Sequence, residues 1–151
     1  MYLLTSPLAL EVDMFNAVGK DAIGQEWLGE IPVGGGSCDY IALNEHKPTS
    51  TVEVTLDSSG SATYEIIADT AWDNISLTDS LLTKVSSDDV FVFGSLIGRS
   101  EASYNTLQQL LNVANFKVFD VNLRAPHYKL DTLLKLMKKA DFIKLNDDEL
   151  Y

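Results

Sequence analysis

The sequence predicts an α/β fold built around a mainly parallel sheet, and two observations lead to this prediction. From Leu77 onward, segments with helical spacing of apolar residues alternate with short apolar, β-branched segments. Such alternation is typical of parallel strands joined by right-handed helical crossovers. The chain has 151 residues, of which 46% are hydrophobic, so it is long enough to form one domain with a sizeable core.

The first part of the chain is expected to form a strand, a helix and a second short strand. Residues 12–18 are strand-like and end at Gly19, and residues 20–30 place Ile23, Trp27 and Ile31 at helical spacing. Residues 32–37 are expected to be a loop, because consecutive glycines disfavour regular structure. Residues 40–43 could be a short strand.

A β-hairpin is predicted next, with strands at residues 51–56 and 62–67 around a turn at 57–60. Partial alternation in both strands indicates one covered face and one wet face. The hairpin is either an ordinary sheet edge or a flap that covers a ligand crevice. Tyr64 and Trp72 are aromatic residues that either belong to the core or pack over a sugar ring.

The remaining elements alternate regularly between helix and strand. The helix at residues 77–85 is expected to be capped by Ser76 or Thr78. The other expected elements are a buried strand at 90–93, a helix at 103–113, a strand at 117–120, an amphipathic helix at 130–140 with Leu130, Leu133, Leu134 and Met137 on one face, and a last strand at 142–145.

Composition excludes several classes of function. The net charge of −11 argues against a nucleic-acid partner or an anionic membrane surface. The single cysteine, Cys38, excludes an internal disulfide and fits a reducing compartment. A signal peptide has basic residues before its apolar run, and the apolar N-terminal run of this chain has none. No apolar run is long enough to span a membrane. We therefore expect a cytoplasmic protein.

Other candidate sites lack the residues that their chemistry needs. The glycines at 34–36 are followed by Ser37 without the Lys-Ser/Thr of a phosphate-binding loop. Gly19-Lys20 is interpreted as a flexible turn for the same reason. His46, His127 and Cys38 are too widely spaced in the sequence to suggest a zinc site.

Two polar clusters follow expected strands. Asp120, Asn122 and Arg124 follow one strand, and Asn146 and Glu149 follow another. Open α/β sheets bind ligands at the carboxyl ends of their strands, and these side chains suit a hydroxylated, phosphorylated or magnesium-bound ligand. A purely structural interpretation stays open, because Asp and Asn commonly form turns at strand ends and Asn-x-x-Glu is close to a helix capping box.

Several motifs resemble the PfkB (ribokinase-like) family of carbohydrate kinases, its fructokinase branch above all, from about residue 17 to residue 151. In chain order they are Ala17-Val18-Gly19-Lys20-Asp21-Ala22-Ile23-Gly24, Pro48-Thr49-Ser50-Thr51-Val52-Glu53-Val54, Ala71-Trp72-Asp73-Asn74-Ile75, Phe93-Gly94-Ser95-Leu96, Phe119-Asp120-Val121-Asn122-Leu123-Arg124 and Lys144-Leu145-Asn146-Asp147-Asp148-Glu149.

The resemblance implies a ribokinase-like three-layer sandwich with a β-hairpin lid at about residues 48–68. It also implies magnesium-dependent transfer of the ATP γ-phosphate to a sugar hydroxyl, with fructose favoured. By carry-over, Asn122 and Arg124 lie near the sugar or the transferred phosphate, and Tyr64 is a further sugar contact. Asn146 and Glu149 belong to the network that organises magnesium, its waters and phosphate, with no direct metal ligand assigned.

The sequence also departs from the family pattern. No Gly-Gly-x-x-x-Asn segment precedes Val12, and the Gly-Ala-Gly-Asp segment that carries the catalytic base in the family does not occur. We therefore expect residues 1–151 to form a single partial domain, incomplete at both ends and catalytically incomplete alone. Asp120 is expected to lie beside Arg124 as a structural group, so it is not assigned as the base.

Two other functions remain open. The chain could be a non-catalytic sugar-binding or dimerisation module of the same fold, since an exposed hairpin edge can pair with a second copy. A flavodoxin-like domain is disfavoured by the hairpin and by the lack of a phosphate-binding loop after the first strand.

Overall fold

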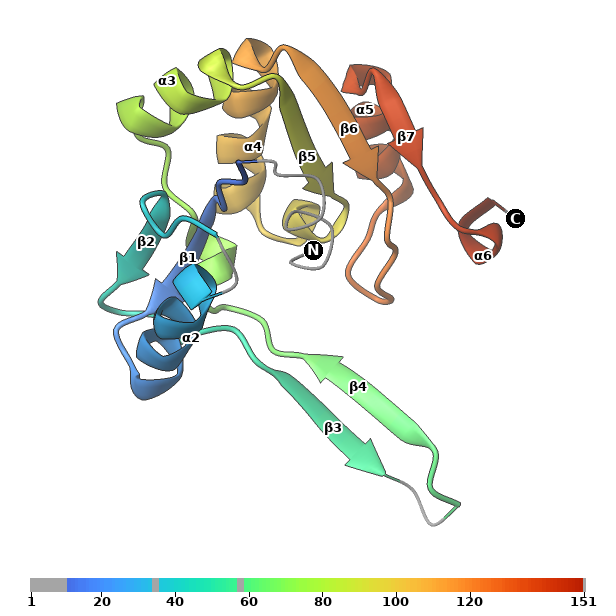
Figure 1. The fold of residues 1–151 in the computed structure, drawn as a ribbon. Coiled ribbons are helices and arrows are strands. Elements are labelled where there is room, and N and C mark those ends of the chain that lie inside the picture. Colours follow the sequence, from blue (N-terminus) through green and yellow to red (C-terminus); the bar gives the residue numbers. More distant parts are fainter. Residues whose placement is uncertain (1–10, 34–35, 57–58, 151) are drawn as a thin grey trace. The chain divides into compact units, whose positions relative to one another are not determined.

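A computed structural model describes residues 11–33, 36–56 and 59–150. It confirms the predicted α/β class, with parallel strand pairs, helical crossovers and one antiparallel hairpin (Figure 1). The described residues form two compact units that divide after Ile75, and each unit is described by itself. Among these residues, no helix is both long enough and apolar enough to span a membrane.

The first unit contains a parallel strand pair, two helices and the hairpin. Strand β1 (Asn16–Gly19) pairs in parallel with β2 (Ile41–Asn44), and helix α2 (Ala22–Val33) connects them. The hairpin consists of β3 (Val52–Leu56) and β4 (Ala62–Ile66), and the short 3-10 helix η1 (Ala71–Asn74) follows it. The apolar core of this unit contains Ala17, Val18, Ile31, Ala71 and Ile75.

Helix α2 differs from the expectation at its end and on its buried face. It continues through Pro32 to Val33, where a loop was expected; residues 34 and 35 of that loop lie outside the described residues. Proline has no N–H to donate to the carbonyl of Leu28, and the Cys38 thiol lies 3.5 Å from that oxygen as a donor instead. The buried face carries Gly24 and Ile31, two turns apart, whereas Ile23 is exposed.

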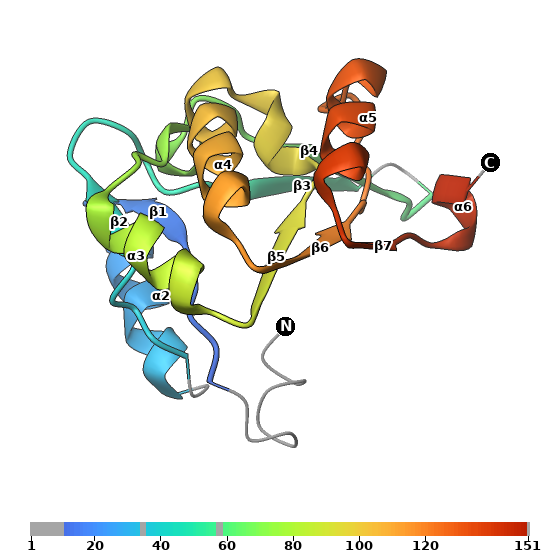
Figure 2. The same ribbon diagram turned by 90° about the horizontal axis from the view of Figure 1, so that it is seen from above.

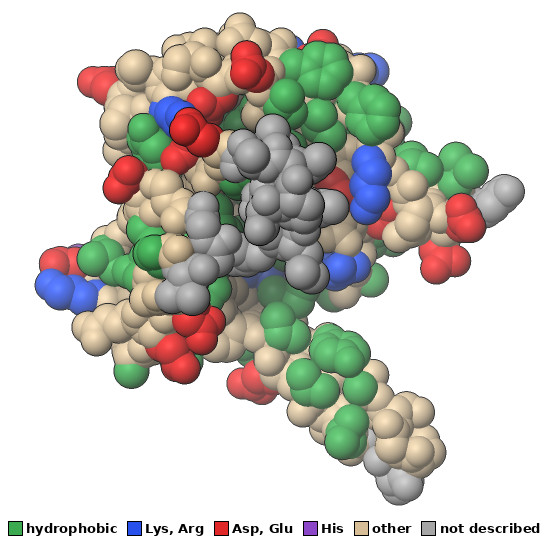
Figure 3. Space-filling model, in the orientation of Figure 1, with side chains coloured by type: hydrophobic (Ala, Val, Ile, Leu, Met, Phe, Trp, Pro, Cys, Tyr) green, Lys and Arg blue, Asp and Glu red, His purple; other side chains and the backbone are tan. Residues whose placement is uncertain are grey.

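The hairpin separates apolar from polar side chains but neither face is covered by the described residues. In the antiparallel register, Val54 lies opposite Tyr64 on one face, and Glu53 lies opposite Glu65 on the other. All five residues of β3 are exposed, so the expectation of one covered face is wrong. The ribbon extends away from the rest of its unit, and no other described element of that unit packs on it (Figures 1 and 3).

The second unit is built around a parallel sheet in the order β5-β6-β7. Helix α3 begins after Thr78, whose hydroxyl accepts a hydrogen bond from Leu81 N at 3.2 Å, as predicted for a cap. Helices α4 and α5 cover one face of the sheet (Figure 2). The elements are α3 (Asp79–Ser87), β5 (Val90–Gly94), η2 (Leu96–Arg99), α4 (Glu101–Val113), β6 (Phe116–Asp120), α5 (Leu130–Lys139), β7 (Phe142–Lys144) and α6 (Asp147–Leu150).

One face of this sheet forms the core of the unit. Phe93 stacks on Phe119 with ring centroids 5.0 Å apart, and both are buried. The opposite face is apolar too, yet Val90, Val92 and Phe142 are exposed on it. The expectation that residues 90–93 form a buried strand is therefore right for only one of the two faces.

The buried face of α5 is also rotated relative to the predicted one. Leu133 and Leu136 are buried, whereas Leu130 and Leu134 are exposed. Leu130 is the first residue of the helix, where apolar spacing alone does not show which turn reaches the sheet.

Candidate functional site

The candidate site of the second unit lies where its three parallel strands end. Gly94, Asp120 and Lys144 are in register across the sheet. Backbone hydrogen bonds continue beyond the strands, from Ser95 N to Val121 O at 3.3 Å and from Val121 N to Lys144 O at 2.9 Å. The loop after β6 is therefore held between the loops after β5 and β7.

Asp120 pairs with Lys144, not with Arg124 as expected. The distance from Lys144 Nζ to Asp120 Oδ1 is 2.9 Å. Paired residues of neighbouring parallel strands point to the same face, so the two side chains meet directly. The loop carries Arg124 farther along, where its guanidinium is exposed and donates to Leu123 O at 3.1 Å.

Asn122 turns the chain at the end of β6. Its φ of 42° lies in the left-handed region, which asparagine tolerates better than most residues. Its carbonyl oxygen accepts a hydrogen bond from the hydroxyl of Ser95 at 3.4 Å, and its side chain is exposed. Asn122 thus has a structural role in the turn while its amide remains accessible to a ligand.

Asn146 and Glu149 form the capping box that their spacing allows. Asn146 N donates to Glu149 Oε2 and Glu149 N donates to Asn146 Oδ1, both at 3.0 Å. In addition, Glu149 Oε1 accepts a hydrogen bond from Leu123 N at 2.7 Å. One carboxylate therefore joins the two polar clusters.

The pKa of Glu149 reflects this position. Burial raises the pKa, but the backbone hydrogen bonds from Asn146 and Leu123 and the charge of Lys144 lower it by more. The net pKa lies below the usual glutamate value, so Glu149 is ionised at neutral pH and accepts these bonds as a carboxylate.

Ser95 and Lys144 belong to this site but were not assigned a role from the sequence. Ser95 is buried and follows β5 directly. Its hydrogen bonds to Val121 O and Asn122 O tie the end of β5 to the β6 loop. Its only sequence signal is its position directly after the apolar run of β5, inside the Phe93-Gly94-Ser95-Leu96 motif. Lys144 is the first residue of the Lys144-Leu145-Asn146-Asp147-Asp148-Glu149 motif, but its partner has no signal in the sequence, because the register that brings Lys144 to Asp120 is a property of the folded sheet.

Tyr64 lies in the first unit, on the apolar face of the hairpin. It is 68% exposed. The residue is therefore accessible to a ligand. Trp72 is half-buried in η1.

The first unit contains a polar junction where a flexible turn was expected. Asp21 Oδ1 accepts hydrogen bonds from Gly24 N at 2.8 Å and from the hydroxyl of Thr49 at 2.7 Å, and Oδ2 accepts one from Thr49 N at 2.8 Å. The Thr49 hydroxyl oxygen in turn accepts a bond from Gly19 N at 2.9 Å. Gly19-Lys20 is thus part of a closed network, and the flexible-turn interpretation is wrong.

Comparison with known proteins gives a family and a set of similar folds. The family model described as pfkB family carbohydrate kinase matches residues 4–151. No match is found among curated proteins.

Solved structures with a similar fold include several sugar kinases. A fructokinase from Halothermothrix orenii has a TM-score of 0.82 at 19% identity, with 95% of this chain and 54% of that chain covered. An uncharacterised sugar kinase from Pyrococcus horikoshii, in complex with ATP, has a TM-score of 0.79 at 23% identity, with 98% and 52% covered. The fructokinase from Vibrio cholerae O395 has a TM-score of 0.78 at 19% identity, with 96% and 53% covered. These likenesses show the fold, and the chain spans about half the length of each of these proteins.

Proposed function

Because the chain belongs to the PfkB family of carbohydrate kinases, we propose that it forms the sugar-facing part of an ATP-dependent kinase that phosphorylates a sugar hydroxyl. The observation that carries the proposal is the joining of the two polar clusters through Glu149, which gathers Asn122, Arg124 and Asn146 at one edge of the sheet. Fructose is the favoured sugar, on the resemblance of the sequence motifs to fructokinases.

The chemistry of this edge suits phosphoryl transfer. Catalysis of that reaction depends mainly on positioning the reactants and neutralising charge on the phosphoryl group. Arg124 is exposed at the site and provides a guanidinium that can bind phosphate oxygens in pairs. Asn122 can both donate and accept hydrogen bonds with sugar hydroxyls.

ATP and magnesium enter the proposal as the family's co-substrate and cofactor. Among the described residues, no group of three His, Cys, Asp or Glu side chains is placed to hold a metal ion. Mg²⁺ usually takes most of its ligands from water and substrate phosphates. Asn146 and Glu149 are the residues we propose for the surrounding hydrogen-bond network.

We further propose that the 151 residues alone do not turn over substrate. Asp120, the strand-end carboxylate, is paired with Lys144, so it is poorly placed to take a proton from a sugar. The test is an ADP-release assay with Mg-ATP and a panel of fructose, ribose and a ketodeoxy acid. We expect no turnover; magnesium-dependent phosphorylation of any of these sugars by the pure chain would contradict the assignment of a missing base.

A second candidate function is assembly through the hairpin. Its apolar face exposes Val52, Val54, Leu56 and Tyr64, and such a ribbon can bind a second copy. Sedimentation velocity would test this with Val54→Lys on the apolar face and Thr55→Lys on the polar face as the matched control. A dimer that only Val54→Lys dissociates supports assembly, whereas a wild-type monomer at high concentration excludes it.

A further inference from the structure

The hairpin joins the rest of the first unit through a short stem, which we define as residues 47–49 before β3 and residues 69–71 after β4. The first segment is tied to the end of β1 and the start of α2. Thr49 donates two hydrogen bonds to Asp21, one from its N–H and one from its hydroxyl, at 2.8 and 2.7 Å. Asp21 is the residue before α2 and also accepts from Gly24 N, so the same carboxylate caps the helix and holds the stem.

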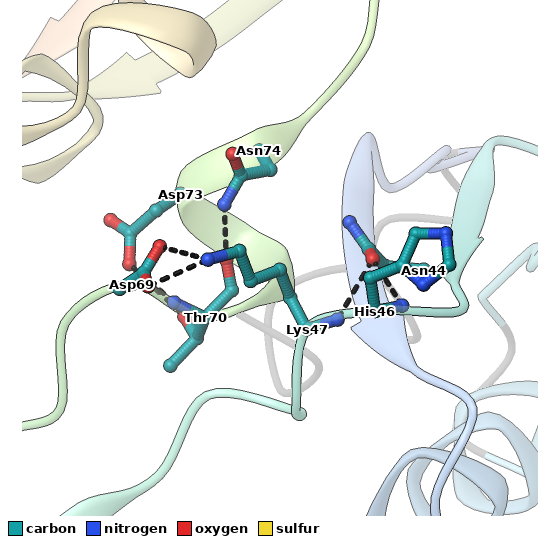
Figure 4. Close-up of polar contacts among 7 residues, drawn as sticks. All are labelled: Asn44, His46, Lys47, Asp69, Thr70, Asp73 and Asn74. Carbon is teal, nitrogen blue, oxygen red and sulfur yellow. Dashed lines mark hydrogen bonds and ion pairs between the residues drawn. The ribbon is translucent and has the colours of Figure 1, made fainter.

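The second segment of the stem is tied to the first. Lys47 Nζ lies 2.6 Å from both carboxylate oxygens of Asp69, and Ala71 N donates to Pro48 O at 2.8 Å. Figure 4 shows the Lys47 side chain reaching across to Asp69, while the backbone N–H of Lys47 is bound by Asn44 at the end of β2. The two chain segments that lead to the hairpin are therefore linked to each other and to the sheet.

The stem ends in a buried polar turn. Thr70 is fully buried, and its N–H and hydroxyl both donate to Asp73 Oδ2 at 3.1 Å. Asn74 Nδ2 donates to Thr70 O at 2.9 Å (Figure 4). Buried polar groups that are fully hydrogen-bonded hold one geometry, because an alternative geometry would leave them unsatisfied.

Close packing leaves this junction no room to shift. A Cβ atom on Gly19 would lie 2.5 Å from Asp21 Oδ2 and 2.6 Å from Thr49 N. One on Gly24 would overlap with the carbonyl oxygen of Gly19 and lie 2.8 Å from the Thr49 hydroxyl. The two glycines of the Gly-x-Asp-x-x-Gly motif are thus required by the contact between the β1–α2 turn and the stem.

The hairpin ladder itself begins farther out. Its strands are paired from Val52–Ile66 to Leu56–Ala62, and Ile67 N donates to Thr51 O at 3.1 Å. Ser50 and Ala68 lie between this ladder and the stem, one on each side. The hairpin strands are exposed on both faces, so the contacts that fix their orientation are those of the stem.

We propose that Asp21 is a positioning residue for the hairpin: it fixes the stem to the β1–α2 turn, and hairpin movement is confined to the pivot formed by Ser50 and Ala68. The relevance of the proposal to sugar binding rests on the proposed kinase function and on the β-hairpin lid that the family resemblance implies for residues 48–68. A lid whose stem is fixed swings along one path, which limits the set of positions that its apolar face and Tyr64 can take.

Distance measurements between two spin labels test the pivot without any ligand. The labels replace Thr63 on the hairpin and Glu26 on α2, which are both exposed residues of the first unit, and Cys38→Ser removes the native thiol. Asp21→Asn replaces one carboxylate oxygen that accepts hydrogen bonds, and Thr49→Val removes the hydroxyl that donates to Asp21. Thr49→Ser keeps this hydroxyl. Asp39→Asn changes an exposed aspartate of the same unit and is the matched control.

We expect a broader distance distribution in Asp21→Asn and Thr49→Val, and the wild-type distribution in Thr49→Ser and Asp39→Asn. Amide exchange at Ala71, across the stem from Asp21, should become about tenfold faster in the first two variants, as for loss of a cap and its local structure. An unchanged distribution, or faster exchange confined to the first turn of α2, would overturn the proposal and leave Asp21 as a helix cap. If Asp21→Asn does not fold, Thr49→Val and Thr49→Ser decide the outcome.

A missing sugar response would have a different signature. The label distances are measured without ligand, so a failure to bind sugar would leave those of the four variants as expected. Such a failure would contradict only the proposed kinase function.

Discussion

Asp21 in the first unit and Glu149 in the second do comparable structural work in different surroundings. Each carboxylate caps the start of a helix and also accepts a hydrogen bond from a distant backbone N–H. Asp21 binds the N–H of Thr49, 28 residues away, and Glu149 binds the N–H of Leu123, 26 residues away. Both have lowered pKa values, because hydrogen bonds favour the ionised form.

The two junctions differ in how much room surrounds them. Two glycines close the Asp21 network, and added atoms there would overlap with backbone. Glu149 and Asn146 lie at the accessible edge of a sheet, with the exposed side chains of Asn122 and Arg124 beside them. In our proposals, the first junction fixes the stem of the hairpin, whereas the second holds the β6 loop for a ligand.

The largest expected effect comes from filling the closed junction. Gly24→Ala should destabilise the folded chain by about 3 kcal/mol, because the added methyl must displace the Gly19 carbonyl or Thr49. Gly29→Ala in the same helix is the control, since a Cβ there meets no atom and alanine favours helices by about 1 kcal/mol. Urea unfolding of both variants measures the difference; equal stabilities would mean that the junction is not tightly packed.

A smaller effect is expected at the open junction. Glu149→Gln should cost about 1 kcal/mol, because the amide can accept only one of the two bonds from Asn146 and Leu123. Amide exchange should accelerate at Leu123, while Asp148→Asn, one position earlier and exposed, should leave it unchanged. Acceleration of the same size in both variants would show that α6 frays as a whole, without a specific link to the β6 loop.

Acid should weaken the closed junction in a defined direction. The folded-state pKa of Asp21 is lowered, chiefly by the Thr49 and Gly24 hydrogen bonds, so its stabilisation is present above the unfolded-state pKa of about 3.9 and is lost as the pH falls through the lower folded-state value. The difference in unfolding free energy between wild type and Asp21→Asn should therefore be constant near neutral pH and shrink below about pH 4. A difference that grows on acidification would contradict the assigned sign.

The smallest effect is expected for the ion pair between the two stem segments. Lys47 and Asp69 are close, but the aspartate side chain is 77% exposed, so Lys47→Met should cost about 0.5 kcal/mol or less and the cost should fall in high salt. Lys20→Met removes the exposed pair with Glu45 and is the reference for a bridge outside the stem. A salt-independent loss larger than that of Gly24→Ala would make the ion pair, rather than Asp21, the main support.

The elements of the fold could be predicted because their signals are local. The hairpin follows from β-branched strands around a glycine-containing turn, and the capping box follows from the spacing of Asn146 and Glu149. The partners of charged groups could not be predicted. Asp120 meets Lys144 because β6 and β7 are in register, and no feature within either segment specifies that register.

Burial was the other property that the sequence left open. Val90 and Val92 are apolar on the exposed face of β5, and Val52 and Val54 are equally apolar on the exposed hairpin. Apolar alternation shows which residues share a face, but not whether the chain supplies a layer to cover it. The role of Gly19 could not be predicted either. Glycine occurs both in flexible turns and in packed junctions with no space for a side chain, and the sequence does not distinguish the two.

We propose that the β6 loop, held by Glu149, binds a sugar or its phosphate. The most direct test is an amide NMR titration of the chain with fructose, then with fructose and magnesium plus a non-hydrolysable ATP analogue, for wild type, Arg124→Ala and Lys138→Ala. Lys138 is an exposed lysine of α5 and controls for loss of one positive charge. We expect the amides of residues 121–124 and 146–149 to shift on titration, and only Arg124→Ala to abolish the response. A folded, well-dispersed spectrum in which these amides do not respond to either titration would contradict it.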